Sequence, residues 1–308
     1  MTDSESPKPT RPIVVLGGTG HYGRKIVSSL VARHEPVRVL SREPARARQV
    51  LGPQPDILRG DLTAPSSVDE ALDGAQAVVV AVSAANRQSI RQRLKIELDG
   101  VLGMLERAAR GGVTRVAYLS GYDVREDFAR ELGLVDFVRP MLEVEAALSE
   151  SKLEWTVLGC APSMEIFFAM IRGDTMTVPG GGPPALPTVS ADDVGEIAAQ
   201  VALRSDLAGR RIRLTGPEAL SFPEAARRIS TVWGRTVRYR PIPLFPLRVA
   251  SWITWPFSPY LAFLSCAVRL LKHFPEQVAA EVPADHASLR QLFQYVPTSL
   301  EVEARQRG

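Results

Sequence analysis

The stretch that decides the fold is IVVLGGTGHYGRKIV, residues 13–27. An apolar run leads into Gly17, Gly20 and Gly23, and a helical pattern follows directly. The first glycine permits a tight turn, the second lets a ligand approach the backbone, and the third lets the helix pack closely on the sheet. A helix start also offers free N–H groups to phosphate. This setting predicts a dinucleotide-binding loop. The predicted loop also contains Thr19, His21 and Tyr22.

Apolar runs alternate with helical patterns along the first half of the chain. The predicted strands are 13–16, 37–40, 56–59, 77–82, 115–120, 155–158 and 211–214. The predicted helices are 23–31, 66–72, 88–110 and 141–151, with a fifth that Ser190 caps and a sixth that Gly234 ends. Alternation of this kind predicts an α/β fold, a doubly wound parallel sheet (Rossmann) with a smaller, mainly helical C-terminal lobe that binds substrate.

Three regions are expected along the 308 residues. Residues 1–11 read as a disordered tail, because they are polar and rich in proline. Residues 12–160 are expected to form the dinucleotide-binding Rossmann domain. Residues 161–308 are expected to form an interleaved substrate-binding lobe with an aromatic lid near 244–274.

The composition narrows the function classes. With 37 basic and 34 acidic residues the net charge is only +3, and no basic block suggests a nucleic-acid groove. The two cysteines lie far apart, which argues against a disulfide framework or a metal site and fits a reducing cytoplasm. The N-terminus has no apolar core of a signal peptide. A cytoplasmic location is therefore expected.

The end of the second predicted strand indicates which dinucleotide binds. NAD sites place Asp or Glu there, whereas this chain has Ser41 and Arg42, with Arg46 close behind. A guanidinium can pair with a 2′-phosphate, so NADP(H) is the expected cofactor, although these arginines could also be an ordinary solvated helix start. Further cofactor contacts are expected at the ends of the third and fourth strands, from Asp61, Leu62, Ala81, Val82 and Ser83.

One uncharged segment, 249–268, has the length of a membrane span. Pro256 and Pro259 near its middle would break a single helix, so a buried or ligand-facing helical pair is favoured over membrane contact. Seven of the twenty aromatic residues fall between Phe245 and Phe274. Such a segment suits a lid over a bulky apolar substrate, a core of packed helices, or a membrane-surface segment.

The motifs GGTGHYG, SRE, GDL and YLSG, with the block VEAALSESKLEWTVLGCAPSME, resemble the atypical short-chain dehydrogenase/reductases of the NmrA-like group. The resemblance runs from about residue 13 to residue 303. It implies NAD(P)-dependent reduction by a monomer or homodimer, but the Tyr-x-x-x-Lys pair of ordinary members is absent. Met141 stands where many NmrA-like enzymes carry a lysine. The usual proton-donating groups are therefore missing.

Two functions remain open from the sequence. The favoured one is an NADPH-dependent ketoreductase-like enzyme acting on a carbonyl or quinone of a bulky apolar substrate, such as a polycyclic aromatic one. The proton would then come from water, from a substrate hydroxyl, or from the side chain of Ser120 or Tyr122 at the end of the fifth predicted strand. The alternative is a non-catalytic NADP(H) sensor of the NmrA type that acts through a protein partner.

Overall fold

The large sheet is the centre of the molecule. The computed structural model describes residues 11–245 and 258–308. Seven parallel strands lie in the order β10-β6-β5-β4-β1-β2-β3, which confirms the predicted doubly wound α/β fold. Their bounds are β1 Ile13–Leu16, β2 Val37–Ser41, β3 Asp56–Arg59, β4 Ala77–Val80, β5 Arg115–Gly121, β6 Glu154–Cys160 and β10 Arg210–Leu214.

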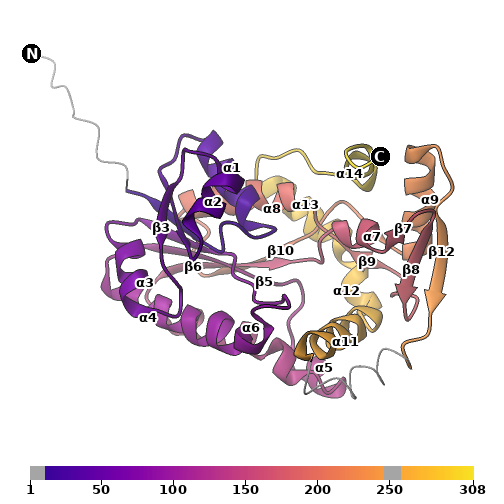
Figure 1. The fold of residues 1–308 in the computed structure, drawn as a ribbon, viewed down its shortest axis with the longest axis horizontal. Helices are drawn as coiled ribbons and strands as arrows, with labels where there is room; N and C mark the ends of the chain where they lie inside the picture. The colour runs from indigo at the N-terminus through magenta and orange to yellow at the C-terminus, as the bar shows by residue number, and fades with distance from the viewer. Residues whose placement is uncertain (1–10, 246–257) are drawn as a thin grey trace, which may run out of the picture.

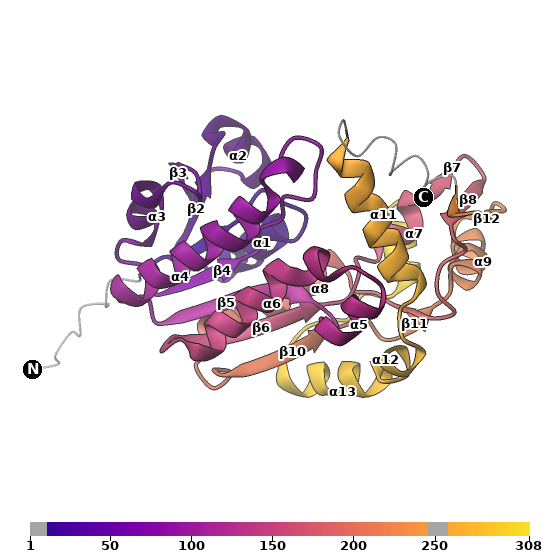
Figure 2. The same cartoon turned by 90° about the horizontal axis from the view of Figure 1, so that it is seen from below.

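Helices cover both faces of this sheet (Figures 1 and 2). One face carries α1 (Gly23–Ala32), α8 (Ala191–Leu203) and α13 (Val282–Leu292), and the other carries α3 (Pro65–Leu72), α4 (Val101–Arg110) and α6 (Val135–Glu150). α2 (Pro44–Leu51) follows β2. Along β4 the buried valines alternate between the two cores, Val79 in one and Val78 and Val80 in the other. A strand covered on both faces needs such a continuous apolar run.

The strand order reverses between β1 and β4, which are neighbours in the sheet. In open α/β sheets, ligands bind in the crevice beyond the carboxyl ends of the strands at this reversal. The glycine loop follows β1, and residues 81–83 follow β4. The fold therefore brings the predicted phosphate loop and the predicted nicotinamide-side residues to one edge.

Several predicted boundaries were wrong. β4 ends at Val80 rather than at residue 82, because Ala81 already turns past Gly17. The predicted helix 88–110 is a 3₁₀ turn (Ile90–Gln92), a π-helix (Lys95–Gly100) and then α4. The predicted helix 141–151 begins at Val135 and contains Pro140, whose preceding turn is helical despite the missing N–H donor.

The C-terminal lobe holds small sheets that the sequence did not reveal. One has the order β12-β8-β7 (Arg238–Ile242, Thr175–Pro179 and Ile171–Arg172), and the other pairs β11 (Ala219–Leu220) with β9 (Leu186–Pro187). Around them lie α7 (Glu165–Ala169), α9 (Phe222–Trp233) and α14 (Leu300–Arg305). Phe167 and Phe222 form the lobe's core, with ring centroids 5.1 Å apart.

The predicted cap at Ser190 and the predicted helix end at Gly234 are confirmed. The Ser190 hydroxyl accepts a hydrogen bond from the Asp192 N–H at the start of α8, and Ser221 does the same for Glu224 in α9. Gly234 ends α9 with a φ of 63°. Although both come late in the chain, β10 completes the large sheet and α8 covers one of its faces. The division into 12–160 and 161–308 therefore stays an interpretation of an interleaved molecule.

The aromatic segment is described only in part. Trp252, Trp255 and Phe257 lie outside the described residues. α11 (Pro259–Lys272) begins with the proline that the sequence marked as a helix break, and α12 (Glu276–Ala280) follows. α11 lies beside α5 (Glu126–Glu131) in both views (Figures 1 and 2). Among the described residues no helix is both long and apolar enough to cross a membrane.

Candidate cofactor and active site

The glycine loop is packed too tightly for side chains at two of its three glycines. Gly17 has a φ of +78°, and a Cβ there would lie 2.4 Å from the Ala81 carbonyl oxygen. A Cβ on Gly23 would lie 2.1 Å from the Gly17 oxygen. The close approach at Gly23 is to Gly17 and Gly18, directly after β1, so a side chain there would push the start of α1 away from the end of this strand.

The third glycine, Gly20, faces open space apart from the Gly17 oxygen, 3.1 Å from its added Cβ. Its N–H donates to that same oxygen at 2.9 Å and closes the turn. Thr19 beside it is exposed. No side chain caps the start of α1. In its first turn the Arg24 and Lys25 N–H groups donate to the Gly20 and Tyr22 carbonyls, which leaves the N–H groups that precede them for a ligand. An open backbone cradle at a helix N-terminus fits a pyrophosphate.

His21 and Tyr22 fasten the loop to the segment that follows β6. One ring nitrogen of His21, Nε2, lies 2.9 Å from the Ser163 hydroxyl, and the other, Nδ1, lies 3.3 Å from Glu165. The Tyr22 hydroxyl donates to the Ala161 carbonyl at 3.5 Å. Burial lowers the pKa of His21, and the Glu165 carboxylate opposes this shift. These contacts hold the phosphate loop against the C-terminal lobe.

At the end of β2 the predicted arginines are available to a ligand. Arg42 is exposed and makes no hydrogen bond or ion pair with the part of the chain that the structure describes. Arg46 makes only a 3.9 Å exposed pair with Glu43, and the Ser41 hydroxyl accepts from the Glu43 N–H. Arg59, which the sequence reasoning missed, is exposed on β3 in register with Ser41. These residues could hold a 2′-phosphate.

Asp61 and Leu62, after β3, already have local roles. One Asp61 carboxylate oxygen accepts from the N–H and the hydroxyl of Thr63, both at 2.8 Å. Leu62 packs against the core, and its side chain lies 3.1 Å from the position of a Cβ on Gly100. Any contact of Asp61 with the adenine would use its second oxygen.

The residues after β4 form the opposite wall of the cradle. The Ala81 N–H donates to the Leu16 carbonyl at 2.9 Å, which fixes this loop against the end of β1. Val82 packs partly on the core, while Ser83 is exposed and its hydroxyl accepts from the Ala85 N–H. This loop therefore presents backbone and a hydroxyl beside the glycine loop.

Ser120 is held by a carboxylate that the sequence reasoning missed. Its hydroxyl donates to Glu145 Oε1 on α6 at 2.5 Å, and Glu145 Oε2 pairs with Arg211 on β10 at 3.0 Å. Arg211 also donates to the carbonyls of Gly121 and Tyr122. The Arg211 guanidinium lies 2.8 Å from the position of a Cβ on Gly159, so the lack of a side chain at Gly159 leaves room for the Arg211 side chain.

Tyr122 lies apart from Ser120. It is 2% exposed, its hydroxyl donates to Asp285 on α13 at 2.6 Å, and Arg213 stacks on its ring at 5.5 Å. Burial and the hydrogen bond to Asp285 raise the pKa of Tyr122. Since α6 and α13 cover opposite faces of the sheet, the two predicted proton donors are not brought together.

Met141 on α6 occupies the position at which many NmrA-like enzymes carry a lysine, and its side chain lies beside the end of β5. Its sulfur is 3.4 Å from the position of a Cβ on Gly121. Glu145 follows one helical turn later and reaches Ser120. This spacing was the one sequence signal that could have pointed to Glu145. Tyr118 lies between Glu97 and Glu145, and burial and these carboxylates raise its pKa.

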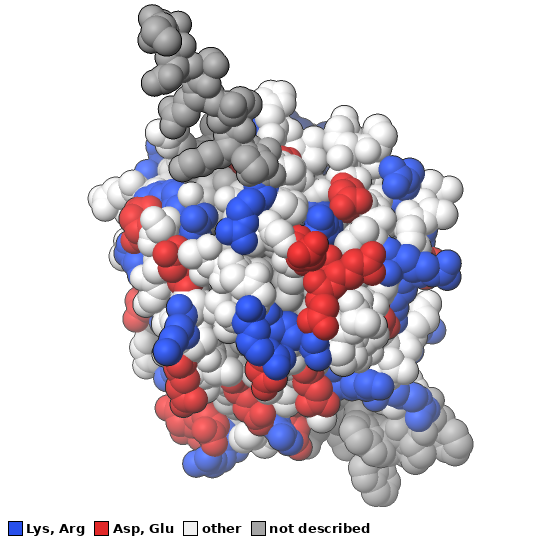
Figure 3. Space-filling view, turned by 90° about the vertical axis from the view of Figure 1, so that its left-hand side faces the viewer, with Lys and Arg blue, Asp and Glu red and all other residues white. Residues whose placement is uncertain are grey.

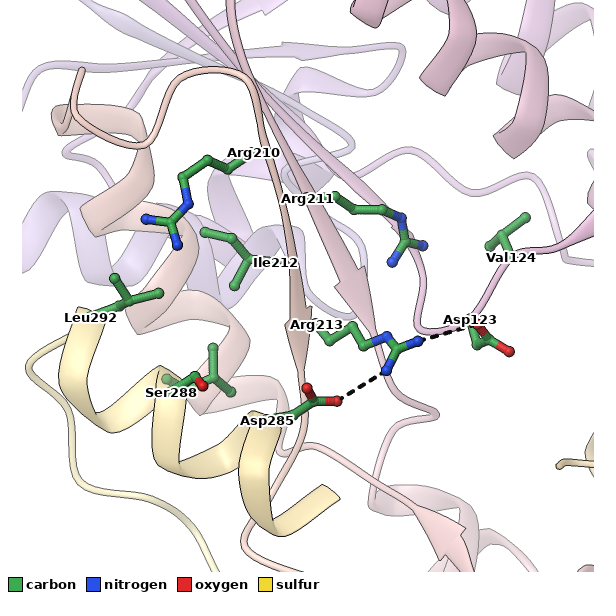
Figure 4. A pocket seen from close by; sticks show the side chains of 10 residues that line it. Asp123, Val124, Arg210, Arg211, Ile212, Arg213, Asp285, Ser288 and Leu292 are labelled. Carbon is green, nitrogen blue, oxygen red and sulfur yellow. Dashed lines mark hydrogen bonds and ion pairs between the residues drawn. The ribbon is translucent and has the colours of Figure 1, made fainter. Parts of the chain in front are cut away.

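A cavity of about 430 Å³ lies between β10, α13 and the residues after β5, and Arg211, the partner of Glu145, is one of the residues that line it (Figure 4). Arg213 extends from β10 between Asp123 and Asp285, with 3.5 Å ion pairs to both. These charges bind one another, and none comes from the glycine loop. On the face shown in Figure 3, basic side chains lie among acidic ones. In residues 11–245 and 258–308 no cluster of three or more His, Cys, Asp or Glu side chains suits a metal ion.

Comparison with known proteins agrees with this geometry. A family model described as NAD(P)H-binding matches residues 17–204. The chain belongs to this NAD(P)H-binding family. The predicted membership of the NmrA-like group of atypical short-chain reductases is confirmed. The residues of the glycine cradle and of the loop after β4 fall within the matched range or at its first position.

Two curated relatives span most of this chain. A (4-alkanoyl-5-oxo-2,5-dihydrofuran-3-yl)methyl phosphate reductase of Streptomyces griseus is 28% identical, covering 83% of this chain and 86% of the relative. An NAD(P)H azoreductase of Xenophilus azovorans is 26% identical, covering 75% and 77%. Among solved structures, the triphenylmethane reductase of Citrobacter sp. complexed with NADP(H) has a TM-score of 0.72 at 19% identity, covering 96% and 99%, and shares the fold. The chain is an NAD(P)H-dependent oxidoreductase.

Proposed function

We propose that this chain is an NADPH-dependent reductase that transfers hydride to a carbonyl or quinone of a bulky apolar substrate. The observation that carries the proposal is Ser120, whose hydroxyl is held by Glu145 at the crevice end of β5. It stands at the edge of the sheet that also bears the glycine cradle and the loop after β4. The chain would act in the cytoplasm as a monomer or homodimer.

The preference for NADPH over NADH rests on the end of β2. Arg42 is exposed there without a described partner, and Arg59 lies on the neighbouring strand. Two guanidinium groups suit the 2′-phosphate that distinguishes the two cofactors. Gly17, Gly20 and Gly23 would hold the pyrophosphate, with Thr19, His21 and Tyr22 beside it. Ala81, Val82 and Ser83 would line the nicotinamide ribose.

When bound, NADPH supplies the hydride. Ser120 supplies the proton to the substrate oxygen and recovers one from solvent, so that a carbonyl gains one hydride and one proton. Glu145 orients the Ser120 hydroxyl, and Arg211 fixes Glu145 through its 3.0 Å ion pair. This arrangement takes the place of the absent Tyr-x-x-x-Lys pair. Tyr122, bonded to Asp285, has a structural role in this proposal.

Two of the three proteins named above, an azoreductase and a triphenylmethane reductase, support a bulky aromatic substrate by their names, whereas the Streptomyces griseus reductase acts on a smaller phosphate ester. Aromatic side chains of the C-terminal lobe agree with this substrate class. The ring centroids of Phe274 and Tyr122 lie 6.3 Å apart, and the Arg87 guanidinium lies over the ring of Tyr260. Because both curated relatives are reductases, a non-catalytic sensor is not favoured.

The test is NADPH consumption against polycyclic aromatic ketones and quinones. Ser120→Ala should lower kcat by about 10²- to 10⁴-fold, the usual contribution of a positioned proton donor, with NADPH affinity unchanged. Glu145→Gln should lower kcat less. Ser149→Ala on the outer side of α6, where the hydroxyl bonds only the Ala146 carbonyl, is the matched control. Full activity in Ser120→Ala would remove Ser120 from the chemistry. Tight NADPH binding without turnover of any acceptor would contradict the reductase.

A further inference from the structure

Two charged side chains, Glu97 and Arg93, connect the loop after β4 to α11. Glu97 Oε1 accepts a hydrogen bond from the Ala84 N–H at 2.6 Å, directly after the predicted cofactor residues 81–83. Glu97 Oε2 pairs with Arg93 Nε at 2.8 Å. The two side chains are 13% and 12% exposed, and Ala84 is 1% exposed. This buried contact fixes the backbone on the nicotinamide side of the crevice.

A rare backbone form places Glu97 there. Residues Lys95–Gly100 form a π-helix between the 3₁₀ turn and α4. π-helical turns are uncommon and often occur at functional sites, because they re-aim side chains relative to a regular helix. Here the wider turn aims the Glu97 carboxylate at the loop after β4.

Arg93 extends the link into the C-terminal lobe. Its guanidinium lies 5.3 Å from the ring of Phe137 on α6 and 5.3 Å from the ring of Phe263 on α11. It also donates to the Phe137 carbonyl at 2.6 Å, and the two rings lie 5.0 Å apart. The two rings contact each other and the guanidinium lies beside both, and a cation–π contact shielded from water is worth more than an exposed one. The C-terminal lobe is thus connected to the cofactor loop by Phe263, Arg93, Glu97 and Ala84.

We propose that Arg93 and Glu97 are positioning residues that couple cofactor binding to the seating of α11 over the substrate. The inference rests on the proposed function, which puts the nicotinamide beside residues 81–83. The bound cofactor stabilises the loop conformation that the hydrogen bond from Ala84 to Glu97 holds. Because Glu97 pairs with Arg93, the cofactor then also stabilises the position of Arg93 beside Phe263 on α11. By linkage, the effect is reciprocal, so a change on α11 alters cofactor affinity.

The experiment is a double-mutant cycle read as the Kd for NADPH, measured by nucleotide fluorescence without acceptor. Phe263→Leu, which removes a ring that does not itself line the glycine cradle, should weaken NADPH binding about threefold to tenfold. Arg93→Met should weaken it by at least as much. The double variant should bind no more weakly than Arg93→Met alone, because the link is already broken.

Two further variants keep the test decisive. Phe128→Leu removes the ring beneath Arg125 on the neighbouring α5, a cation–π pair that does not involve Arg93, and should leave the Kd unchanged. Glu97→Gln keeps an acceptor for the Ala84 N–H but loses the charge that binds Arg93, and should show an intermediate loss in a folded protein. An unchanged Kd in Phe263→Leu, or additive losses in the double variant, would overturn the coupling. Neither result would touch the proposed function, whose failure would appear as absent turnover in the unsubstituted chain.

Discussion

Gly23→Ala is the most direct test of the glycine cradle. The added Cβ would lie 2.1 Å from the Gly17 oxygen and 2.8 Å from the Gly18 Cα. Real Cβ atoms essentially never lie closer than 3.0 Å to another heavy atom, so the loop and the start of α1 must separate by about 0.9 Å or more. All the obstructing atoms belong to the backbone, and no rotamer change relieves the clash. Overpacking of this kind costs about 1–3 kcal/mol.

Both stability and affinity should report that cost. Unfolding entropy of about 2.1 cal/mol/K per residue amounts to about 0.65 kcal/mol/K for this chain, so the Tm should fall by about 1.5–5 °C. A further cost of the same size that falls on the NADPH-bound state alone would lower NADPH affinity by about 5- to 150-fold. Calorimetry with and without NADPH measures both.

The matched control is Gly103→Ala, in the interior of α4. A Cβ there meets no atom within 4 Å, and alanine favours a helix over glycine by about 0.5–1 kcal/mol. Its Tm should rise by about 1 °C with an unchanged Kd. A Gly23→Ala variant that behaves like this control would refute the packing argument and, with it, the assignment of the cradle.

Three further predictions address separate parts of the molecule. Arg42→Ala should weaken NADPH binding by about tenfold or more, as expected for a hydrogen bond to a charged group, and should leave NADH binding unchanged; equal losses in titrations of both nucleotides would contradict the 2′-phosphate contact. Tyr122→Phe should lose about 1–2 kcal/mol of stability in urea unfolding, because Asp285 loses a donor, while kcat stays within about twofold. Burial raises the pKa of Asp193 to about 6 from 3.8, despite two hydrogen bonds from Thr298. The folded chain therefore holds this proton more tightly than the unfolded chain, and the stability gained from it is present below about pH 4 and lost as the pH rises to about 6. The difference is about 3 kcal/mol, so Asp193→Asn should flatten the decline of unfolding free energy over this range, and an unaltered slope would argue against the shifted pKa.

The sequence predicted those parts of the molecule that depend on residues close together in the chain. Gly17, Gly20 and Gly23 follow an apolar strand within a few residues, and Ser190 stands directly before its helix, so turn and cap chemistry identify them without knowledge of the fold. The parallel sheet follows from the regular alternation of apolar runs with helical patterns.

The parts that could not be predicted depend on distant residues. Ser120, Glu145 and Arg211 come from β5, α6 and β10, and only the sheet order brings them together. The segment Lys95–Gly100 has an ordinary helical sequence pattern, so the sequence does not distinguish its π-helix from an α-helix. Its wider turn is seen only in the structure, where Glu97 accepts from the Ala84 N–H. The short strands β7, β9 and β11 have two residues each, too few for a period of two to be visible.

The arginines of β10 have a consequence for association between copies of the chain. β10 is the last strand of the large sheet, and within the described residues only β6 pairs with it. An exposed edge of this kind can template pairing with the same edge of another molecule. In an antiparallel pairing centred on Ile212, however, Arg211 of each copy would face Arg213 of the other. Like charges directly opposite one another are destabilising. The strand that carries the arginine support for Glu145 thus also discourages runaway sheet extension and aggregation at high concentration.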